Sequence, residues 1–388
     1  MSHQDHGRDQ DVYVTAVGMA PFGKHRDRDF ESLGREAVTR ALADGGLRRE
    51  DIDEALCGTG YGGPMAGQRV LGRLGLTGIP VSNLENACSS GATALRDAIA
   101  AIRSGRSETV LVLGVDHLTR FGGGTLPLET TDPEVRAGMV MPGVYAMRAN
   151  RYLHETGADV TALARVTVKS RHNGARNPYA HFRKESTVDE VLAARPIAEP
   201  FTLPMCSPVS DGAAALVVMG RAARDRHGAS GPRIDASVLL SGQFETGFRD
   251  MAHSDLARRT AEAAYEQAGV GPGDLDVVEL HDAFSSAELM YYESFGLCGP
   301  GEAAELLARG ETALDGRIPV NPSGGLLSRG HPVGATGIAQ LCEAVWQLRG
   351  EAGDRQVREP RVAMTHCSGG GISGFDHGAS CVHILTKS

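Results

Sequence analysis

Apolar residues recur along this chain in two patterns, and each pattern predicts a different element. Short, almost wholly apolar runs such as VLVLGV (110–115) and AAALVVM (213–219) predict strands that are buried on both faces. Segments with an apolar residue every three or four positions, ended by glycine, predict amphipathic helices. No apolar run reaches the roughly 18 residues of a membrane-spanning helix. The pattern therefore predicts an α/β protein that does not cross a membrane.

The order of these elements occurs twice. The segments that begin at Leu33 and at Leu256 align without a gap through a helix, an Asp-apolar-Asp turn and a short strand. Each helix is followed by a glycine, Gly46 or Gly269, which is the residue that a helix C-terminus prefers. Because helix, cap, turn and strand all share one register, the match indicates a duplication.

A second pair of matching segments lies further along the chain. GATALRDAIAAIRSG from Gly91 resembles GATGIAQLCEAVWQLRG from Gly334, and an apolar strand follows each helix. We therefore predict two duplicated α/β halves, at residues 11–235 and 236–388. The first half also contains residues 117–205, rich in Gly, Pro, Arg and Met, which have no counterpart in the second. An insertion of this size predicts a loop subdomain that covers the substrate.

Charge and cysteine content narrow the class of protein. A net charge of −9 and a pI near 5.9, without a basic run, argue against binding to nucleic acid or to an anionic membrane surface. The 7 cysteines are scattered and form no CxxC pair, which argues against a disulfide framework and a zinc cluster. Residues 1–11 are polar and lack the apolar core of a signal peptide. We expect a cytoplasmic protein.

The repeat predicts which loops meet. Cys88 precedes the first of the two matching helices and His331 precedes the second, so the duplication predicts that the thiol and the imidazole lie close together. A thiol at a helix N-terminus is expected to have a lowered pKa, because unpaired N–H groups favour the thiolate. The alternative is a buried structural cysteine.

Two further residues carry candidate chemistry. His281, in ELHDAF, is expected between a strand and a helix, either as a functional imidazole or as a histidine bonded in a turn by Asp282. Cys367, in THCSGGG, follows a predicted strand and precedes three glycines whose N–H groups are free to donate.

Together, NACSSG, NPYAHFRKEST, SPVSDGAAALVV, HDAFS, NPSGGLLSRGHPVGATG and CSGGG resemble the thiolases. The resemblance is closest to the sterol-carrier-protein type and its bacterial and archaeal relatives, and it covers nearly the whole chain. It implies a five-layered αβαβα fold made of two duplicated halves, in agreement with the repeat.

The resemblance also implies a role for each candidate residue. Cys88 matches the nucleophile that takes the acyl group as a thioester, and His331 matches the histidine that activates it. His281 stands where many thiolases have the Asn of an NEAF motif. Cys367 matches the acid/base that moves the α-proton. The N–H groups of Cys88 and Gly369 match the oxyanion hole.

One departure from the family pattern bears on activity. Sterol-carrier-type thiolases tend to carry a cysteine in an HDCF block where this chain has Ala283, so the acid/base role rests on Cys367. The resemblance implies CoA and acyl-CoA as substrates, with no covalently bound cofactor and no metal. Contacts to CoA are poorly marked, and the candidates are Arg151, Arg171 and Arg183 in the insertion.

The leading hypothesis is an acyltransferase of the 3-ketoacyl-CoA thiolase type. The alternatives are a decarboxylating condensing enzyme, a retro-aldolase or acyltransferase subunit that works with a small zinc-ribbon/OB-fold protein, and a non-enzymatic lipid carrier. Cys367 argues against decarboxylation, which generates the carbanion without a proton-abstracting base. By the same resemblance, we expect a homodimer or a dimer of dimers.

Overall fold

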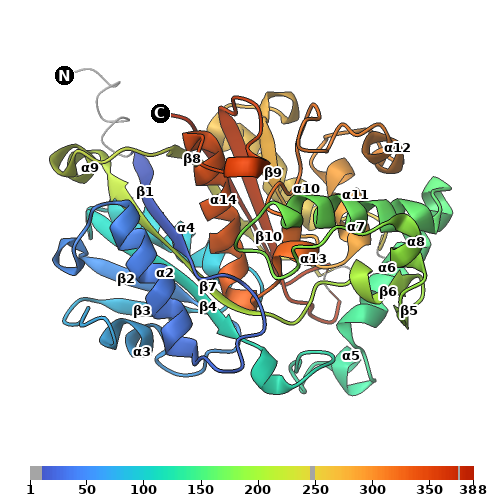
Figure 1. Ribbon diagram of the computed structural model, residues 1–388, viewed down its shortest axis with the longest axis horizontal. Coiled ribbons are helices and arrows are strands. Elements are labelled where there is room, and N and C mark those ends of the chain that lie inside the picture. The colour runs from blue at the N-terminus through green and yellow to red at the C-terminus, as the bar shows by residue number, and fades with distance from the viewer. Residues whose placement is uncertain (1–10, 245–249, 375) are drawn as a thin grey trace.

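The protein, studied as a computed structural model, is described for residues 11–244, 250–374 and 376–388. Its longest sheet has nine strands in the order β3-β2-β4-β7-β1-β8-β11-β10-β9 (Figure 1). The strands are β1 (Val12–Met19), β2 (Glu54–Gly58), β3 (Val81–Leu84), β4 (Thr109–His117), β7 (Asp211–Gly220), β8 (Arg233–Leu240), β9 (Val277–Glu279), β10 (Val362–Gly369) and β11 (Ala379–Thr386). The polar tail expected at the N-terminus lies, up to residue 10, outside the described residues.

The sheet repeats one topology on either side of the β1–β8 contact. In the first half β2 is parallel to β3 and β4, β4 is antiparallel to β7, and β7 is antiparallel to β1. In the second half β9 is parallel to β10, β10 is antiparallel to β11, and β11 is antiparallel to β8. A parallel bridge from Val278 to Val320 takes the place of β3. The two halves therefore have the same strand order, as the sequence repeat predicts.

Four long helices form the layers around this sheet. They are α2 (Phe30–Asp44), α4 (Ser90–Arg103), α10 (Asp255–Ala268) and α14 (Thr336–Arg349). α2 packs on the outer face of the first half and α10 on the outer face of the second. α4 and α14 contact each other and strands of both halves. The five-layered αβαβα arrangement is confirmed.

In the described parts of the chain, five shorter α-helices outside the insertion cover the edges and ends of these layers. They are α3 (Ala66–Gly72), α9 (Arg221–His227), α11 (Ser285–Ser294), α12 (Ala303–Ala308) and α13 (Gly325–Arg329). Among the helices in the described ranges, none has both the length and the apolar character needed to cross a bilayer.

The insertion of the first half lies between β4 and β7. It contains α5 (Pro133–Arg136), α6 (Met141–Thr156), α7 (Val160–Ala175), α8 (Val188–Leu192) and the hairpin β5 (Pro196–Ala198) to β6 (Phe201–Thr202). At the equivalent place in the second half, the loop 370–378 joins β10 to β11. α6 and α7 share a hydrophobic core with α10 and α11, so the insertion packs against the other half of the molecule.

The boundary between the halves differs slightly from the expected one. β8, the first strand of the second half, begins at Arg233, so a boundary between residues 235 and 236 cuts through it. The connection is the short turn 228–232, which contains Gly228 and Gly231, both with positive φ. The repeated segments begin at the helices that follow the first strand of each half, so they do not include β8.

The central strands are buried on both faces, as their apolar runs predict. In β7, Ala213, Ala215 and Val217 belong to the core beneath α2. The alternate residues Leu216 and Val218 belong to the core that contains α4 and α14. This alternation follows from the two-residue period of a strand.

Glycine allows the two inner helices to meet. A Cβ at Gly91 would lie 2.6 Å from the carbonyl oxygen of Gly334, and a Cβ at Gly114 would lie 2.4 Å from that same oxygen. A Cβ at Gly337 in α14 would lie 2.8 Å from the backbone nitrogen of Ala92 in α4. Since these contacts are to backbone, they cannot relax by rotation of a side chain.

We predict that Gly337→Ala lowers the free energy of unfolding by about 1–3 kcal/mol, because the added methyl group overpacks the α4–α14 contact. Guanidinium chloride unfolding measures the change. Gly72→Ala in α3 is the matched control, since no atom lies within 4 Å of its Cβ position; it is expected to be neutral or stabilising. Equal stability of the two variants would contradict a tight crossing of the inner helices.

Candidate active site

Cys88 lies in a tight turn between β3 and α4. Ala87 just before it adopts a φ of +47°, in the left-handed region that residues with a Cβ rarely occupy. The N–H of Ser89 donates to the carbonyl of Asn86 at 3.0 Å, which closes the turn. α4 begins at Ser90, so the half-buried thiol projects from the N-terminal end of a helix.

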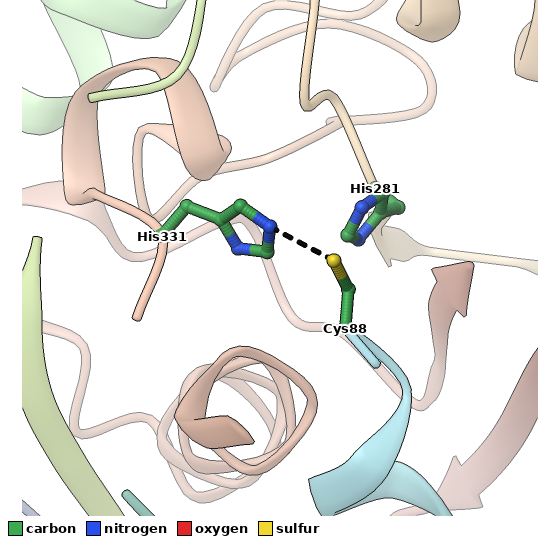
Figure 2. A group of neighbouring side chains, drawn as sticks. All are labelled: Cys88, His281 and His331. Atoms are coloured by element: carbon green, nitrogen blue, oxygen red, sulfur yellow. Dashed lines mark hydrogen bonds between the residues drawn. The ribbon is translucent and has the colours of Figure 1, made fainter. Parts of the chain in front are cut away.

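The structure brings Cys88 and His331 together. The Sγ atom of Cys88 lies 3.2 Å from Nε2 of His331 (Figure 2). On the other side of the ring, Nδ1 lies 2.7 Å from the hydroxyl of Thr336, which donates its own proton to the carbonyl of Pro332 at 2.9 Å. Because the hydroxyl proton is used there, we assign the ring proton to Nδ1. Nε2 then has a free lone pair facing the thiol.

His281 and Cys367 form a second pair beside the first. Nδ1 of His281 lies 3.4 Å from Sγ of Cys367, which donates to the carbonyl of Cys88 at 2.9 Å. The two imidazole rings meet edge to face, with centroids 5.1 Å apart (Figure 2). Each cysteine thus has its own histidine. The large cavity described below is lined by Cys88, His331 and His281, whereas Cys367 is not among its lining residues.

Cys88, His281 and His331 also place three possible metal ligands within 4.8 Å of one another. A metal would need the lone pair of His331 Nε2. Here that lone pair faces the thiol proton instead. The arrangement is therefore better suited to proton transfer than to metal binding.

Burial keeps these groups neutral. Desolvation raises the pKa of the Cys88 thiol to about 12 and lowers the pKa of His331 to about 3. The pKa of His281 is lowered and that of Cys367 is raised, again chiefly by burial. The expectation that the helix N-terminus lowers the pKa of Cys88 is wrong, because desolvation outweighs the nearby N–H donors. Near neutral pH, transfer of the thiol proton to Nε2 of His331 is the route to a thiolate that this geometry offers.

Two backbone N–H groups lie at the Cys88 sulfur. The backbone N–H groups of Cys88 itself and of Gly370 interact with the Cys88 sulfur, and both lower its pKa. Gly370 is the first residue after β10 and has a φ of +62°. Gly369, the residue named by the sequence analysis, also lines the cavity. The run of three glycines was the available signal, but the sequence does not show which of their N–H groups faces the sulfur.

A cavity of about 2150 Å³ opens in front of Cys88, His281 and His331. Its walls come from both halves, and much of its lining comes from the insertion, including residues 122–148 and 203–209. Ala283 also lines it. The insertion therefore lies where a subdomain that covers the substrate would be needed.

The three candidate arginines lie in different places. Arg171 lines the cavity, and its guanidinium lies 3.8 Å from the ring centroid of Phe182. Burial lowers the pKa of Arg171 to about 10. Arg151, paired with Glu155, and Arg183 are both exposed and are not among the cavity-lining residues. The cavity wall also includes cationic side chains that the sequence did not indicate: Lys24, Arg26, Arg148 and Arg195.

Asp116, at the end of β4, joins the loops of the two halves. Its buried carboxylate accepts hydrogen bonds from the Thr59 hydroxyl at 2.9 Å and from the backbone N–H groups of Gly60 and Tyr61, each at 3.0 Å. It also accepts from the N–H of Gly334 at 2.6 Å. This carboxylate fixes the loop that carries His331, and no motif in the sequence pointed to it.

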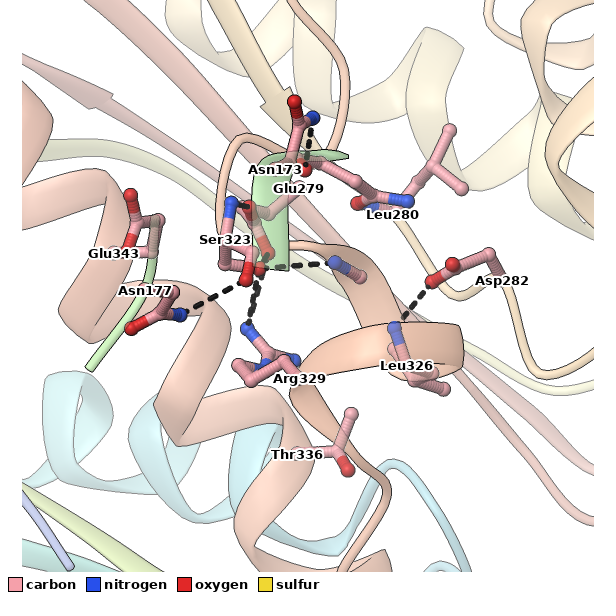
Figure 3. A network of polar contacts seen from close by, with 12 residues as sticks. Asn173, Asn177, Glu279, Leu280, Asp282, Ser323, Leu326, Arg329, Thr336 and Glu343 are labelled. Atoms are coloured by element: carbon pink, nitrogen blue, oxygen red, sulfur yellow. Dashed lines mark hydrogen bonds and ion pairs between the residues drawn. The ribbon is translucent and has the colours of Figure 1, made fainter. Parts of the chain in front are cut away.

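A buried polar network supports the same loop from the other side (Figure 3). The carboxylate of Glu279 accepts from the N–H and the hydroxyl of Ser323, at 3.0 and 2.7 Å, and pairs with Arg329 at 3.0 Å. Burial raises the pKa of Glu279 to about 7, and Arg329 opposes the shift. Asp282 accepts from the N–H of Leu326 at 2.7 Å. Asp282 thus caps α13, and the expected alternative, in which it fixes His281, is not what the structure shows.

Comparison with protein families gives two matches. Residues 12–222 match the thiolase N-terminal domain and residues 244–386 match a domain described as thiolase C-terminal domain-like. The chain is 42% identical over 366 residues to benzoylsuccinyl-CoA thiolase subunit BbsB of Thauera aromatica, covering 93% of this chain and 95% of that protein. It is 38% identical over 387 residues to an acetyl-CoA acetyltransferase of Methanothermobacter thermautotrophicus, covering 97% and 100%.

Solved structures with the same fold include an aldolase and a thiolase. The Ltp2-ChsH2(DUF35) aldolase superposes with a TM-score of 0.83 at 25% identity, covering 98% of each chain. Human mitochondrial 3-ketoacyl-CoA thiolase superposes with a TM-score of 0.77 at 18% identity, covering 97% of this chain and 99% of that one, and this likeness concerns the fold alone.

We predict that the alkylation rate of Cys88 by iodoacetamide rises about tenfold per pH unit between about pH 7 and 9, without a plateau. A thiol whose pKa is raised to about 12 stays protonated over this range, so the thiolate fraction grows with pH. Mass spectrometry of the Cys88 peptide measures the rate. A plateau beginning near pH 7 would mean that a resting thiolate exists and that burial does not dominate.

Proposed function

The chain belongs to the thiolase family, and from this premise we propose that it is a CoA-dependent acyltransferase that cleaves or forms 3-ketoacyl-CoA by Claisen chemistry. The observation that carries the proposal is the Sγ–Nε2 distance of 3.2 Å between Cys88 and His331, at the wall of a cavity large enough for an acyl-CoA. A second cysteine–histidine pair adjoins the first.

In the cleavage direction, Sγ of Cys88 attacks the 3-keto carbon while its proton passes to Nε2 of His331. The bond between the α-carbon and the 3-keto carbon then breaks. The acyl group stays on Cys88 as a thioester, and the electron pair stays on the departing acyl-CoA as an enolate. N–H groups of Cys88 and Gly369, with Gly370 beside them, supply donors for the oxyanion.

The enolate then takes a proton on its α-carbon. Cys367 is the proposed donor, and Nδ1 of His281 lies 3.4 Å from its sulfur, which is left as a thiolate. In the second half of the cycle, the thiol of free CoA gives its proton to the Cys367 thiolate as its sulfur attacks the thioester on Cys88. The acyl group leaves as acyl-CoA, and the Cys88 sulfur takes back the proton held on His331. No metal and no bound cofactor enters any step.

Three of the cationic side chains along the cavity, Arg171, Lys24 and Arg26, supply a place for the phosphates of CoA. Arg171 is the strongest candidate, since it lines the cavity and is stacked on Phe182 rather than on a carboxylate. A guanidinium so placed can donate two hydrogen bonds to one phosphate. Lys24 and Arg26 line the same cavity.

A second candidate function is an aldolase or acyltransferase subunit of a two-protein complex. Two relatives favour it: one is named as a thiolase subunit, and one solved structure is an aldolase with a DUF35 protein. In that case a small zinc-ribbon/OB-fold protein would complete this chain. A cytoplasmic location and a homodimer or a dimer of dimers complete the proposal.

Intact mass and turnover test the roles of the cysteines. We predict that acetyl-CoA adds one acetyl group to the wild-type chain and none to Cys88→Ala. Cys367→Ala is expected to acylate normally but to lose at least about 100-fold in turnover, as expected for the loss of a general acid/base. Cys381→Ala, which removes a buried thiol in the neighbouring strand, is the control.

Two results would overturn these assignments. Full activity of Cys88→Ala on a CoA substrate would remove the nucleophile. Unchanged turnover of Cys367→Ala would remove the acid/base and would favour the aldolase or condensing-enzyme alternatives.

Arg171→Ala is predicted to raise KM for CoA by about tenfold, which corresponds to the loss of a charge-assisted hydrogen bond, with a smaller effect on kcat. Steady-state kinetics with varied CoA measure both constants. Arg183→Ala, whose side chain lies outside the cavity wall, is expected to change KM much less. Equal effects of the two substitutions would place the phosphates elsewhere.

A further inference from the structure

A second polar cluster lines the active-site cavity and has no part in the chemistry above. It consists of Tyr145 and Arg148 on α6 together with Asp376 and His377 on the loop 370–378. We call these four residues the Arg148 cluster. Asp376 and His377 lie on the loop that, in the second half of the chain, takes the place of the insertion found in the first half.

Arg148 is unusual because it is buried at a cavity wall and only part of its guanidinium is bonded. Its side chain is 3% exposed. Nη1 pairs with Asp376 at 2.7 Å and Nε donates to the carbonyl of Met251 at 3.1 Å. Among the described residues, Nη2 has no hydrogen-bond partner. This nitrogen is also not completely buried. Arg148 lines the active-site cavity as well as a small pocket beside Tyr291, and Nη2 is the nitrogen of its guanidinium left to donate to a ligand.

Asp376 does not depend on Arg148 alone. Its carboxylate also accepts from the hydroxyl of Ser254 at 2.6 Å and lies 3.1 Å from Nδ1 of His377. These bonds fix the position of the carboxylate. The ion pair with this fixed carboxylate in turn holds the guanidinium of Arg148 in one orientation.

The cluster lies at the catalytic end of the cavity. Tyr145, whose hydroxyl is 3.2 Å from Nε2 of His377, stacks on Phe284 with ring centroids 4.4 Å apart. Phe284 follows Ala283 in the same HDAF block that carries His281. Ala283, Phe284 and Arg148 line the same cavity as Cys88, so an acyl group on the thiol shares that cavity with an apolar wall and a guanidinium.

We propose that the acyl group transferred by this enzyme carries a carboxylate, which Nη2 of Arg148 binds. The substrate class is then the CoA thioesters of dicarboxylic acids. This inference rests on the proposed acyltransferase function, because it names the acyl group of that same site. A buried, fixed guanidinium at a cavity wall matches a carboxylate, whereas a purely aliphatic acyl group would leave its donors unpaired.

The first experiment compares acyl-CoA thioesters that differ in charge and match in length. Succinyl-CoA and glutaryl-CoA are compared with butyryl-CoA and valeryl-CoA for the rate of Cys88 acylation, followed by intact mass. The wild-type chain is expected to favour the charged thioesters by about tenfold or more, as for a hydrogen bond to a charged group. A preference for the neutral thioesters would overturn the proposal.

Variants separate recognition from folding. Arg148→Gln combined with Asp376→Asn removes both charges without leaving a carboxylate unpaired, and it is expected to abolish the preference while acetyl-CoA still acylates Cys88. Arg148→Lys is expected to retain part of the preference. Arg165→Gln removes an exposed arginine of α7 outside the cavity and is the matched control. An unchanged preference in the double variant would overturn the role of Arg148.

A binding measurement distinguishes failure of the carboxylate proposal from failure of the proposed acyltransferase function. Calorimetry with Cys88→Ala measures the affinities for succinyl-CoA and butyryl-CoA without acyl transfer. If no thioester acylates the wild-type chain, the acyltransferase function fails, and the ratio of the two affinities still decides the specificity. Equal affinities would overturn the carboxylate site even if acetyl-CoA acylates Cys88 normally.

Discussion

The backbone contact at Gly334 is the constraint on which the rest of the site depends. Its carbonyl oxygen lies where side chains at Gly91 and Gly114 would be, so the second half approaches the first as closely as backbones allow. Cys88 precedes Gly91 by three residues, and His331 precedes Gly334 by three. Equivalent positions of the two repeats thus become neighbours at 3.2 Å. The buried carboxylate of Asp116 holds this contact, because it accepts N–H groups from loops of both halves.

The polar groups at this interface fall into two kinds. The carboxylates that support the loops, such as Asp116 and Glu279, are supplied with several donors each, which offsets the cost of burying their charge. The reactive groups have few partners: Cys88 faces one imidazole and N–H groups of its own turn and of Gly370. Burial therefore keeps the resting thiol and imidazole neutral, and charge appears only as the reaction proceeds. A hydrogen-bonded frame around sparsely bonded reactive groups is what proton transfer at this site requires.

The insertion turns this compact centre into a binding site. Without residues 118–210 the catalytic pairs would lie near the open ends of the strands, and with them they lie in a cavity of about 2150 Å³. Two guanidinium groups of the insertion serve different parts of that cavity. Arg171 is stacked on Phe182, whereas Arg148 is fixed by an ion pair to a loop of the opposite half. In the function proposed above, the duplicated core supplies the chemistry, and the parts in which the two halves differ supply selectivity for the substrate.

The sequence alone was sufficient for the two duplicated α/β halves and for the candidates Cys88, His281, His331 and Cys367, and the resemblance to the thiolases added the five-layered arrangement. These depend on local patterns: strand and helix periodicity, glycines that end helices, and short motifs whose spacing is set along the chain. The tertiary structure alone decided the ionisation of Cys88, the N–H of Gly370 at its sulfur, the bridging role of Asp116 and the pairing of Arg148 with Asp376. Each of these depends on groups that are distant in sequence. Desolvation by segments from both halves raises the pKa of Cys88 more than the helix N-terminus lowers it. The sequence could indicate only the helix terminus, because the free energy of a charge depends on every group that surrounds it.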